Sequence, residues 1–447
     1  MSVGMQRLRE EPEVIRQGAL DKGEDASLID VALELDARRR TLTGEADGLK
    51  AERNALSKRV GEAIRGGAAP HGLDVAALRA ASVAAGERIA ALDAEAAEVE
   101  AQLDDLLLRI PNPADPDVPI GDAEANAVVR TWGEILPRVV PGAGAVGADD
   151  DAAAGTWERK PHWEIAEALD IIDLERGAKI AGSGFPVYKG AGAALQRALI
   201  DFFLGVHTRE NGFTEIWPPV VVNAASARGT GQIPDKEDQM YVVTRDELYL
   251  VPTAEVPVTN LHRDEIFEAD ALPVRYAAYT PCFRREAGAA GKETRGILRV
   301  HQFDKVEMVL FERPEASNEA LEWMTGRAED LLRRLGLAYR VLLMATRDMG
   351  FVQAKKYDLE VWAPGVERWL EVSSCSNFRD YQARRMAIRH RPAVGAKPEF
   401  VHTLNGSGLA LARVVAAILE ARQRPDGSVE VPEPLRATLG TDVIRPR

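Results

Sequence analysis

The first third of the chain carries apolar residues at the spacing of a coiled coil. Apolar positions after a turn segment again alternate in steps of three and four, from Val75 to Leu106. Such seams bury themselves against a partner helix. We therefore expect an antiparallel helical hairpin whose first helix spans Leu28 to Arg65 and extends on the order of 55 Å, at about 1.5 Å per residue. The leucines that recur every seven residues are Leu35, Leu42, Leu49 and Leu56, and the turn contains Gly66, Gly67 and Pro70.

From about Trp157 onward the pattern changes to short segments typical of strands. Residues 318–335 instead have the period of an amphipathic helix. Because no strand–helix–strand spacing repeats, we expect an α+β fold with a mostly antiparallel sheet flanked by helices. With the helical arm this predicts two domains, residues 1–112 and 113–447. The expected strands are 213–217, 247–251, 274–280, 305–311, 339–345, 357–363 and 369–375.

Composition narrows the class of protein. The 447 residues include 28% charged residues and have a formal net charge of −14 at pH 7. The chain contains no apolar run of about 18 residues, and its start lacks the apolar core of a secretory signal, so we expect a cytoplasmic protein without a membrane segment. Two cysteines, Cys282 and Cys375, are too few for a disulfide framework or a four-thiolate zinc site, so we expect no zinc. The two thiols could form one disulfide, but reduced thiols are expected in a cytoplasmic protein.

The two arm helices differ in charge. The second is mainly acidic, whereas the first is basic. A solvated coiled-coil surface explains this difference, and the charge run alone favours that interpretation. The alternative is a surface that faces a phosphate backbone. The basic residues of the first helix are Arg38, Arg39, Arg40, Lys50, Arg53, Lys58, Arg59 and Arg65.

The stretch from Cys282 to Met308 concentrates basic residues in an acidic chain. Arg284 and Glu286 stand two apart, so on a strand they would share one face. Arg299 and Phe303 would belong to the returning strand. Arginine suits capture of phosphate or carboxylate and phenylalanine can stack on a base, which together describe a nucleotide held at both ends. The alternative is an exposed basic hairpin.

Three further segments carry weaker signals. In residues 405–413 two glycines precede an apolar run, and Arg413 would lie one to two turns into a helix; no P-loop lysine follows. In residues 371–374, alternation places Glu371 and Ser373 on one strand face and Ser374 on the other. They suit either Mg²⁺ or a polar strand end. Residues 253–255 suit a functional site and the N-cap of a helix equally well, and these residues alone do not decide between the two.

These segments resemble the three signature motifs of class II aminoacyl-tRNA synthetases. GFTEIWPP, with Pro218 at the motif proline, resembles motif 1; the Cys282–Met308 stretch resembles motif 2; and NGSGLALAR resembles motif 3. The specific resemblance is to seryl-tRNA synthetases, and it covers nearly the whole chain, including the arm, GTGQIP, VPTAEVPVTN and EVSSCSNFRDYQARR. It implies an antiparallel catalytic sheet, a coiled-coil arm and a homodimer formed through motif 1.

The resemblance implies an ATP site. Arg284 would contact the α-phosphate and the amino-acid carboxylate, and Arg413 would clamp the γ-phosphate of a bent ATP; these are the expected catalytic residues. Glu286 would contact the adenine amine, and Phe303 would stack on adenine. The other residues implied for ATP are Arg285, Arg299, Val300, Glu371, Val372, Ser373 and Ser374. Among them, Arg285 fills a position often occupied by a small residue and has the weakest case.

The resemblance also implies a serine pocket and a metal site. Glu307 is expected to bind the serine hydroxyl, because a pocket with buried hydrogen-bond partners rejects alanine. Glu371 and Ser374 resemble the Mg²⁺ ligands. Lys292 and Arg295 would face the acceptor end of the tRNA. The residues implied for serine are Thr253, Ala254, Glu255, Arg284, Glu307 and Ser407.

The implied activity is formation of seryl-adenylate from L-serine and ATP, and transfer of serine to tRNA(Ser) and also tRNA(Sec). The arm would read the long variable arm of the tRNA, since no anticodon-binding domain follows motif 3. A duplicate that feeds seryl-tRNA into a biosynthetic pathway and a non-catalytic RNA-binding paralogue remain alternatives. A third alternative is an enzyme of the same superfamily that loads an amino acid onto a carrier protein. Such relatives lack a long tRNA-binding arm, which this chain has, so the arm argues against this alternative. The plain loop at 287–291 and the Ala/Gly/Asp run at 141–155, which looks like an insertion, depart from the family pattern without removing a motif residue.

Overall fold

The computed structural model describes residues 3–65, 75–140, 157–287 and 295–446. It divides the chain into two compact units, Met1–Pro111 and Asn112–Arg447. The expected turn glycines, the run at 141–155 and Lys292 lie outside the described residues. In the described part of the chain, none of the helices combines the length and the apolar character that crossing a membrane requires.

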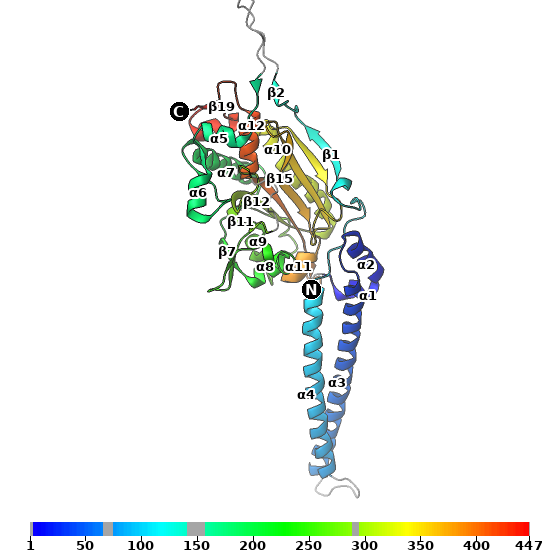
Figure 1. The fold of residues 1–447 in the computed structure, drawn as a ribbon. Coiled ribbons are helices and arrows are strands. Elements are labelled where there is room, and N and C mark those ends of the chain that lie inside the picture. Colours follow the sequence, from blue (N-terminus) through cyan, green and yellow to red (C-terminus); the bar gives the residue numbers. More distant parts are fainter. Residues whose placement is uncertain (1–2, 66–74, 141–156, 288–294, 447) are drawn as a thin grey trace, which may run out of the picture. The chain divides into compact units, whose positions relative to one another are not determined.

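The first unit contains the expected hairpin. Helices α3 (Ser27–Arg65) and α4 (Val75–Leu107) run side by side (Figure 1). At 39 residues, α3 is about 58 Å long. Its seam is that of the predicted heptads: Leu42, Ala46, Leu92 and Val99 form a buried cluster, with Leu35, Leu49 and Ala96 packed against it.

Two short helices before the arm were not expected. Helices α1 (Met5–Glu10) and α2 (Pro12–Asp21) contact α3, and their Leu8 and Ile15 are fully buried. The buried Asp36 of α3 pairs with Arg9 of α1 at 2.8 Å. These helices are too short for a heptad pattern, which explains why periodicity did not reveal them.

An eight-stranded sheet forms the centre of the second unit. Neighbouring strands within the sheet are antiparallel, except for one parallel pair, β6 with β11. All seven predicted strands are present, with 247–251 in a smaller sheet, so the α+β prediction is confirmed. The order is β1 (Ala127–Trp132), β13 (Tyr339–Leu343), β14 (Lys355–Ala363), β15 (Arg368–Asn377), β18 (His402–Ala410), β12 (Gln302–Glu312), β11 (Val274–Phe283) and β6 (Thr214–Ile216).

Helices cover both faces of this sheet. Strand β12 shows it most clearly, since Met308 and Leu310 enter one apolar cluster while Val309 and Phe311 enter another. The first cluster packs under α7 (Ala191–Arg209), α10 (Ser317–Leu335) and α12 (Leu411–Ala421), and the second under α9 (Glu255–Thr259) and α11 (Tyr381–Met386). Burial on both faces explains the nearly continuous apolar run in β12. Figure 1 shows α10 and α12 against the sheet.

Shorter elements complete the second unit. The remaining helices are α5 (His162–Ala168), α6 (Leu174–Ala181), α8 (Ala224–Thr230) and α13 (Arg436–Leu439). The short strands pair as β2 (Val139–Val140) with β3 (Trp157–Glu158), β4 (Ile172–Asp173) with β5 (Val187–Tyr188), β9 (Leu248–Leu250) with β7 (Val221–Asn223) and β8 (Val242–Val243), β16 (Arg389–His390) with β10 (Ile266–Phe267) and β17 (Glu399–Phe400), and β19 (Val429–Glu430) with β20 (Val443–Ile444).

The placement of Arg413 differs from expectation. The glycine-containing segment is the end of strand β18, which pairs with β12 up to Ala410. Helix α12 begins at Leu411, so Arg413 lies in its first turn and not one to two turns in. The strand persists because β12 and β15 both offer it pairing partners, which the local sequence does not reveal.

Candidate active site

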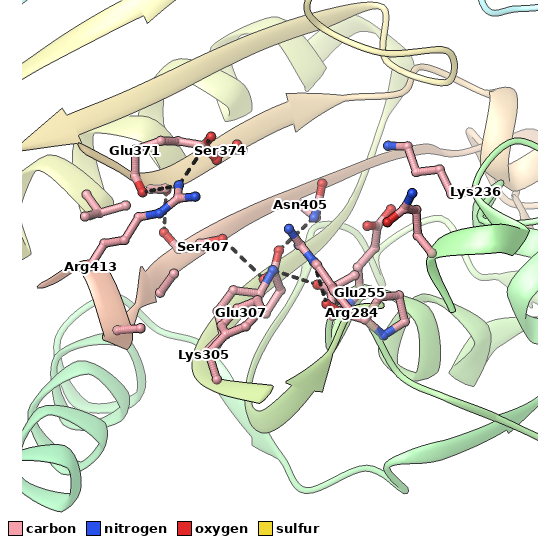
Figure 2. A pocket seen from close by; sticks show the side chains of 18 of the residues that line it. Lys236, Glu255, Arg284, Lys305, Glu307, Glu371, Ser374, Asn405, Ser407 and Arg413 are labelled. Carbon is pink, nitrogen blue, oxygen red and sulfur yellow. Dashed lines mark hydrogen bonds and ion pairs between the residues drawn. The ribbon is translucent and has the colours of Figure 1, made fainter. Parts of the chain in front are cut away.

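A cavity of about 460 Å³ opens in the second unit and gathers all but two of the predicted site residues. Figure 2 shows three groups along it: Arg413 with Glu371, then Glu307 with Arg284, then Glu255. The predicted residues that line it are Thr253, Glu255, Arg284, Glu286, Arg299, Val300, Phe303, Glu307, Glu371, Val372, Ser373, Ser374, Ser407 and Arg413.

The two exceptions have other surroundings. Ala254 is fully buried in the apolar cluster under α9 and α11. Arg285 is exposed, and its Nη1 donates to the carbonyl of Asp238 at 2.9 Å. Its backbone N–H donates to the carbonyl of Gln239, and its side chain does not line the cavity.

The motif 2 strands end before they reach three of the residues that were expected on them. Pairing between β11 and β12 stops at Phe283 and Gln302, so Arg284, Glu286 and Arg299 lie in the connecting segment. The expectation that Arg284 and Glu286 share a strand face is therefore wrong, as is the placement of Arg299 on the returning strand. Glu286 has a left-handed backbone, with φ of 48°. This turn brings its carboxylate within 2.5 Å of the Arg299 guanidinium.

Arg284 and Phe303 are neighbours in the lining of the cavity. The Arg284 guanidinium carbon lies 5.2 Å from the centroid of the Phe303 ring, within cation–π range. Arg284 Nε also donates to the carbonyl of Pro252 at 3.4 Å. An anion at Arg284 and a planar ring at Phe303 would thus lie next to each other.

A buried acidic pocket forms one wall of the cavity. Glu307 is fully buried, and its Oε1 accepts from Asn405 Nδ2 at 2.7 Å. Its Oε2 lies 2.6 Å from Lys305 Nζ and 3.5 Å from Ser407 Oγ. Lys305 Nζ also donates to Thr253 Oγ1 at 2.8 Å. Hydroxyl, amide, ammonium and carboxylate groups therefore converge on one small volume.

Glu255 faces the same pocket from the first turn of α9. Its Oε1 accepts from Gln382 Nε2 at 2.6 Å, and burial, followed by the negative charge of Glu307, raises the pKa of Glu255 to about 7. Its backbone N–H donates to Thr253 Oγ1 at 3.4 Å. The segment therefore begins a helix and supplies the pocket, so the two sequence interpretations are compatible.

A β-bulge changes which residues of β15 face the cavity. Opposite β14, Ser373 pairs with Leu359 and Glu371 with Glu360, which leaves Val372 as the extra residue. An extra residue resets the alternation, so Glu371 and Ser374 share a face and the expectation that they oppose each other is wrong. Ser374 Oγ donates to Glu371 Oε1 at 3.0 Å.

Arg413 anchors this wall to the motif 2 segment. Its Nη1 donates to the Glu371 carbonyl at 2.8 Å, and its Nε donates to the Leu298 carbonyl at 3.0 Å. Glu371 is 46% exposed because it faces the open cavity. Enclosure by the protein tends to raise its pKa, but the charges of Arg413 and Lys356 outweigh this and lower it.

The wall around Glu371 suits a hard cation. Glu371 and Ser374 present oxygen atoms side by side, and Asp358, whose backbone pairs with Ser374, has a buried Oδ1 without a hydrogen-bond partner. Mg²⁺ prefers oxygen ligands, needs only one or two carboxylates and keeps several waters. These residues therefore fit Mg²⁺. Burial raises the pKa of Asp358 to about 7, against the opposing effect of Lys356 at 3.0 Å.

Sequence reasoning missed several polar residues that line the cavity, among them three lysines and Asn405. Lys305 and Asn405 contact Glu307 directly, while Lys356 and Lys236 add positive charge. Strand alternation was a usable signal for Lys305, which stands two residues before Glu307, and for Lys356, two before Asp358. Lys236 follows the GTGQIP segment, where no periodic pattern indicates direction. Cys282 and Cys375 are free and buried, as expected for reduced thiols.

Comparison with known proteins identifies the family. The model of the tRNA synthetase class II core domain (G, H, P, S and T) matches residues 241–422, and that of the seryl-tRNA synthetase N-terminal domain matches residues 4–114. A serine–tRNA ligase of Gemmatimonas aurantiaca is 51% identical over 98% of both chains. One of Thermomicrobium roseum is 51% identical over 97% of this chain and 92% of its own.

A solved structure agrees with these sequence relatives. The crystal structure of seryl-tRNA synthetase from Pyrococcus horikoshii complexed with ATP superposes with a TM-score of 0.90 at 36% identity, covering 100% of both chains. The resemblance thus extends over the arm and the catalytic unit together. The chain belongs to the seryl-tRNA synthetase family of class II aminoacyl-tRNA synthetases.

Proposed function

We propose that this chain is an ATP-dependent serine–tRNA ligase that forms seryl-adenylate and transfers serine to the 3′ end of tRNA(Ser). The single observation that carries this proposal is the acidic pocket at Glu307, which opens into the same cavity as Arg284 and Arg413. Support comes from the relatives, which are named serine–tRNA ligases, and from the related structure, which holds ATP.

In the first step the serine carboxylate oxygen attacks the α-phosphorus of ATP. A new phosphorus–oxygen bond forms, the bond to the β-phosphate oxygen breaks, and pyrophosphate leaves. Arg284, placed between the acidic pocket and Phe303, would hold the carboxylate and the α-phosphate together. Catalysis then rests on positioning and on charge stabilisation, so no side chain acts as nucleophile.

In the second step a hydroxyl of the tRNA's terminal ribose attacks the seryl carbonyl carbon, and AMP leaves. The acyl-phosphate bond that breaks is already activated. Arg295, which lies at the return of the motif 2 loop, would face the acceptor end. Its guanidinium lies 4.8 Å from the Trp163 ring, which restrains its direction.

Serine selection would depend on Glu307 and Glu255. Asn405 and Lys305 hold the Glu307 carboxylate in place. The hydroxyl of serine would donate a further hydrogen bond to this carboxylate. Alanine offers no such donor, so one hydrogen-bonding position of the buried Glu307 carboxylate stays unfilled, which costs roughly 1–3 kcal/mol. The ammonium group of serine would face Glu255, whose carboxylate is buried nearby.

Glu371 and Ser374 would hold Mg²⁺ beside the phosphates. When bound, the ion neutralises negative charge on the phosphate oxygens. Arg413, which lies within 3.6 Å of Glu371, would contact the terminal phosphate from the same wall. Glu286 and Phe303 would contact the adenine, with Arg299 fixing the Glu286 carboxylate.

The arm would bind tRNA, and its free cations lie towards the distal end. Arg38, Arg39 and Lys50 pair with carboxylates of α4, at 2.7, 3.6 and 3.0 Å. In the described part of α3, Arg53, Lys58 and Arg59 make no ion pair or hydrogen bond. Unpaired cations are available for phosphate.

The proposal also includes a second tRNA substrate, an oligomeric state and a location in the cell. The chain would charge tRNA(Sec) as well as tRNA(Ser), work as a homodimer through motif 1, and act in the cytoplasm. Trp217 in motif 1 is 79% exposed, which suits a surface that a second copy covers.

ATP–pyrophosphate exchange, measured with each of the twenty amino acids in turn, tests the activity. Serine alone should support exchange well above the background, and Arg284→Ala should abolish it. Exchange with another amino acid at equal or higher rate would refute serine selection. Absence of any exchange would favour the non-catalytic RNA-binding alternative.

A further inference from the structure

A buried histidine outside the cavity joins three parts of the catalytic unit. His162 stands at the start of α5, and its Nδ1 lies 2.8 Å from Glu420 Oε1, while its backbone N–H donates to the same oxygen at 2.9 Å. Glu420 Oε2 accepts from the backbone N–H groups of Gly365 and Val366 at 2.9 and 3.1 Å. Both carboxylate oxygens are therefore satisfied, and the carboxylate has one orientation.

The second ring nitrogen reaches the motif 2 segment. The backbone N–H of Ile297 donates to His162 Nε2 at 3.3 Å. Because the Ile297 N–H donates to Nε2, Nε2 acts as an acceptor, and the ring N–H that donates to Glu420 is the one on Nδ1. Gly296 permits this approach: it has φ of +76°, and a Cβ there would lie 2.3 Å from Nε2.

Ile297 leads directly into the nucleotide site. The next three residues, Leu298, Arg299 and Val300, all line the cavity. The carbonyl of Leu298 accepts from Arg413 Nε at 3.0 Å. The segment is thus held at two successive residues, by His162 on one side and by Arg413 on the other.

Both holding points depend on one helix. Arg413 and Glu420 lie seven residues apart on α12, which is close to two helical turns, so they project from the same side of the helix. Arg413 contacts the segment directly, and Glu420 does so through His162. A rigid helix therefore sets the position of 297–300 at two points of known spacing.

We propose that His162 is a positioning residue for the ATP site, which fixes residues 297–300 against α12 without touching the substrate. The effect of His162 on catalysis rests on the proposed function. Its effect on the position of residues 297–300 does not, because the Kd of ATP measures that effect directly. Serine binding should be little affected, because the Glu307 pocket is built from other segments, chiefly β12, β18 and the Thr253 segment.

Two substitutions separate the two halves of the imidazole's role. In His162→Asn, the side-chain amide can still donate to Glu420 but cannot reach Ile297. In His162→Gln, the longer side chain can place an acceptor near the Nε2 position, while the contact with Glu420 weakens. Both remove a ring from the same buried site, so they serve as matched variants. His402→Asn is the control for loss of a half-buried, hydrogen-bonded histidine elsewhere; its Nδ1 contacts Ser317 Oγ at 2.7 Å.

The experiment measures the Kd of ATP by calorimetry, KM for ATP and for serine in the exchange reaction, and Tm. We expect His162→Asn to raise the Kd and KM of ATP by roughly three- to tenfold, with KM for serine changed less than about twofold. His162→Gln should recover most of the ATP affinity. His402→Asn should lower Tm and leave the constants for ATP unchanged.

A second variant approaches the contact from the other side. Gly296→Ala inserts a methyl group against Nε2 and should raise the Kd of ATP while His162 remains intact. Equal ATP constants in wild type and His162→Asn would overturn the proposal, and so would identical losses in the Asn and Gln variants. If wild type shows no serine-dependent exchange, the proposed function fails, while the Kd of ATP still decides the role of His162.

Discussion

At the scale of single residues, the acidic pocket depends on a balance of buried charges. Glu255 and Glu307 are nearly or fully buried, and Lys305, also buried, contacts Glu307 and Thr253. A buried carboxylate without a partner is costly, whereas a complete pair is close to neutral in stability. Lys305 therefore matters less as a source of stability than as the group that keeps Glu307 oriented.

Lys305→Met tests this balance. The variant leaves Glu307 buried without its cation, so we expect a loss of about 3–5 kcal/mol in the free energy of unfolding and a large rise in KM for serine. The double variant Lys305→Met/Glu307→Gln should recover most of the stability but not serine activation. Urea unfolding and exchange kinetics measure both. Full stability of the single variant would contradict this assignment.

Glu255 predicts a dependence on pH. Burial raises its pKa to about 7 from 4.5, so the folded state binds this proton more tightly than the unfolded state does. Its contribution to stability is then complete below about pH 4.5 and is lost as pH rises through 7. Relative to Glu255→Gln, wild type should lose on the order of 3 kcal/mol across this window without serine. Parallel stability curves for the two proteins would contradict the raised pKa.

At the scale of elements, small irregularities of strands and turns position the side chains of the site. The bulge at Val372 brings Glu371 and Ser374 to one face, and the turn at Glu286 brings its carboxylate to Arg299. On the arm, ion pairs with α4 occupy Arg38 and Lys50. The surface of α3 is therefore not uniformly available to a polyanion.

We predict that the unpaired basic residues of α3 contribute most of the arm's affinity for tRNA. Replacing Arg53, Lys58 and Arg59 by alanine should raise KM for tRNA and reduce the slope of log affinity against log salt by about one per lost phosphate contact. Pyrophosphate exchange should not change. The matched control replaces the paired Arg38, Arg39 and Lys50, and its effect should be smaller. Equal effects of the two triple variants would remove the distinction between them.

At the scale of the whole molecule, the two compact units separate the proposed tasks. All residues of the cavity belong to Asn112–Arg447, and the free cations belong to Met1–Pro111. Amino-acid activation needs only the cavity, whereas transfer also needs a tRNA bound in register. The arm should thus be dispensable for the first step and required for the second.

Shortening the arm tests this division. Removing residues 50–88 and joining the ends with a short Gly-Ser linker keeps the base of α3, where α1 and α2 pack. We expect exchange within about twofold of wild type and charging of tRNA(Ser) reduced by at least about a hundredfold, because each lost phosphate contact weakens binding. Aminoacylation with purified tRNA measures the second step. Normal charging by the shortened protein would refute the role of the arm.

The sequence alone determined the features that depend on local pattern. The heptad at Leu35 and Leu42 predicted the hairpin, and alternating segments predicted the strands of the central sheet. All the site residues that motif resemblance named line the cavity, except Ala254 and Arg285. Periodicity and motif chemistry depend on residues that are close together in the sequence, so a single sequence is enough to recognise them.

Only the tertiary structure decided which atoms meet. The bulge at Val372 depends on pairing with β14, and the extension of β18 to Ala410 depends on pairing with β12. Lys305 joins Thr253 across 52 residues of sequence, and His162 joins Glu420 across 258. Such contacts arise when distant segments pack together, and no local period of the sequence encodes them.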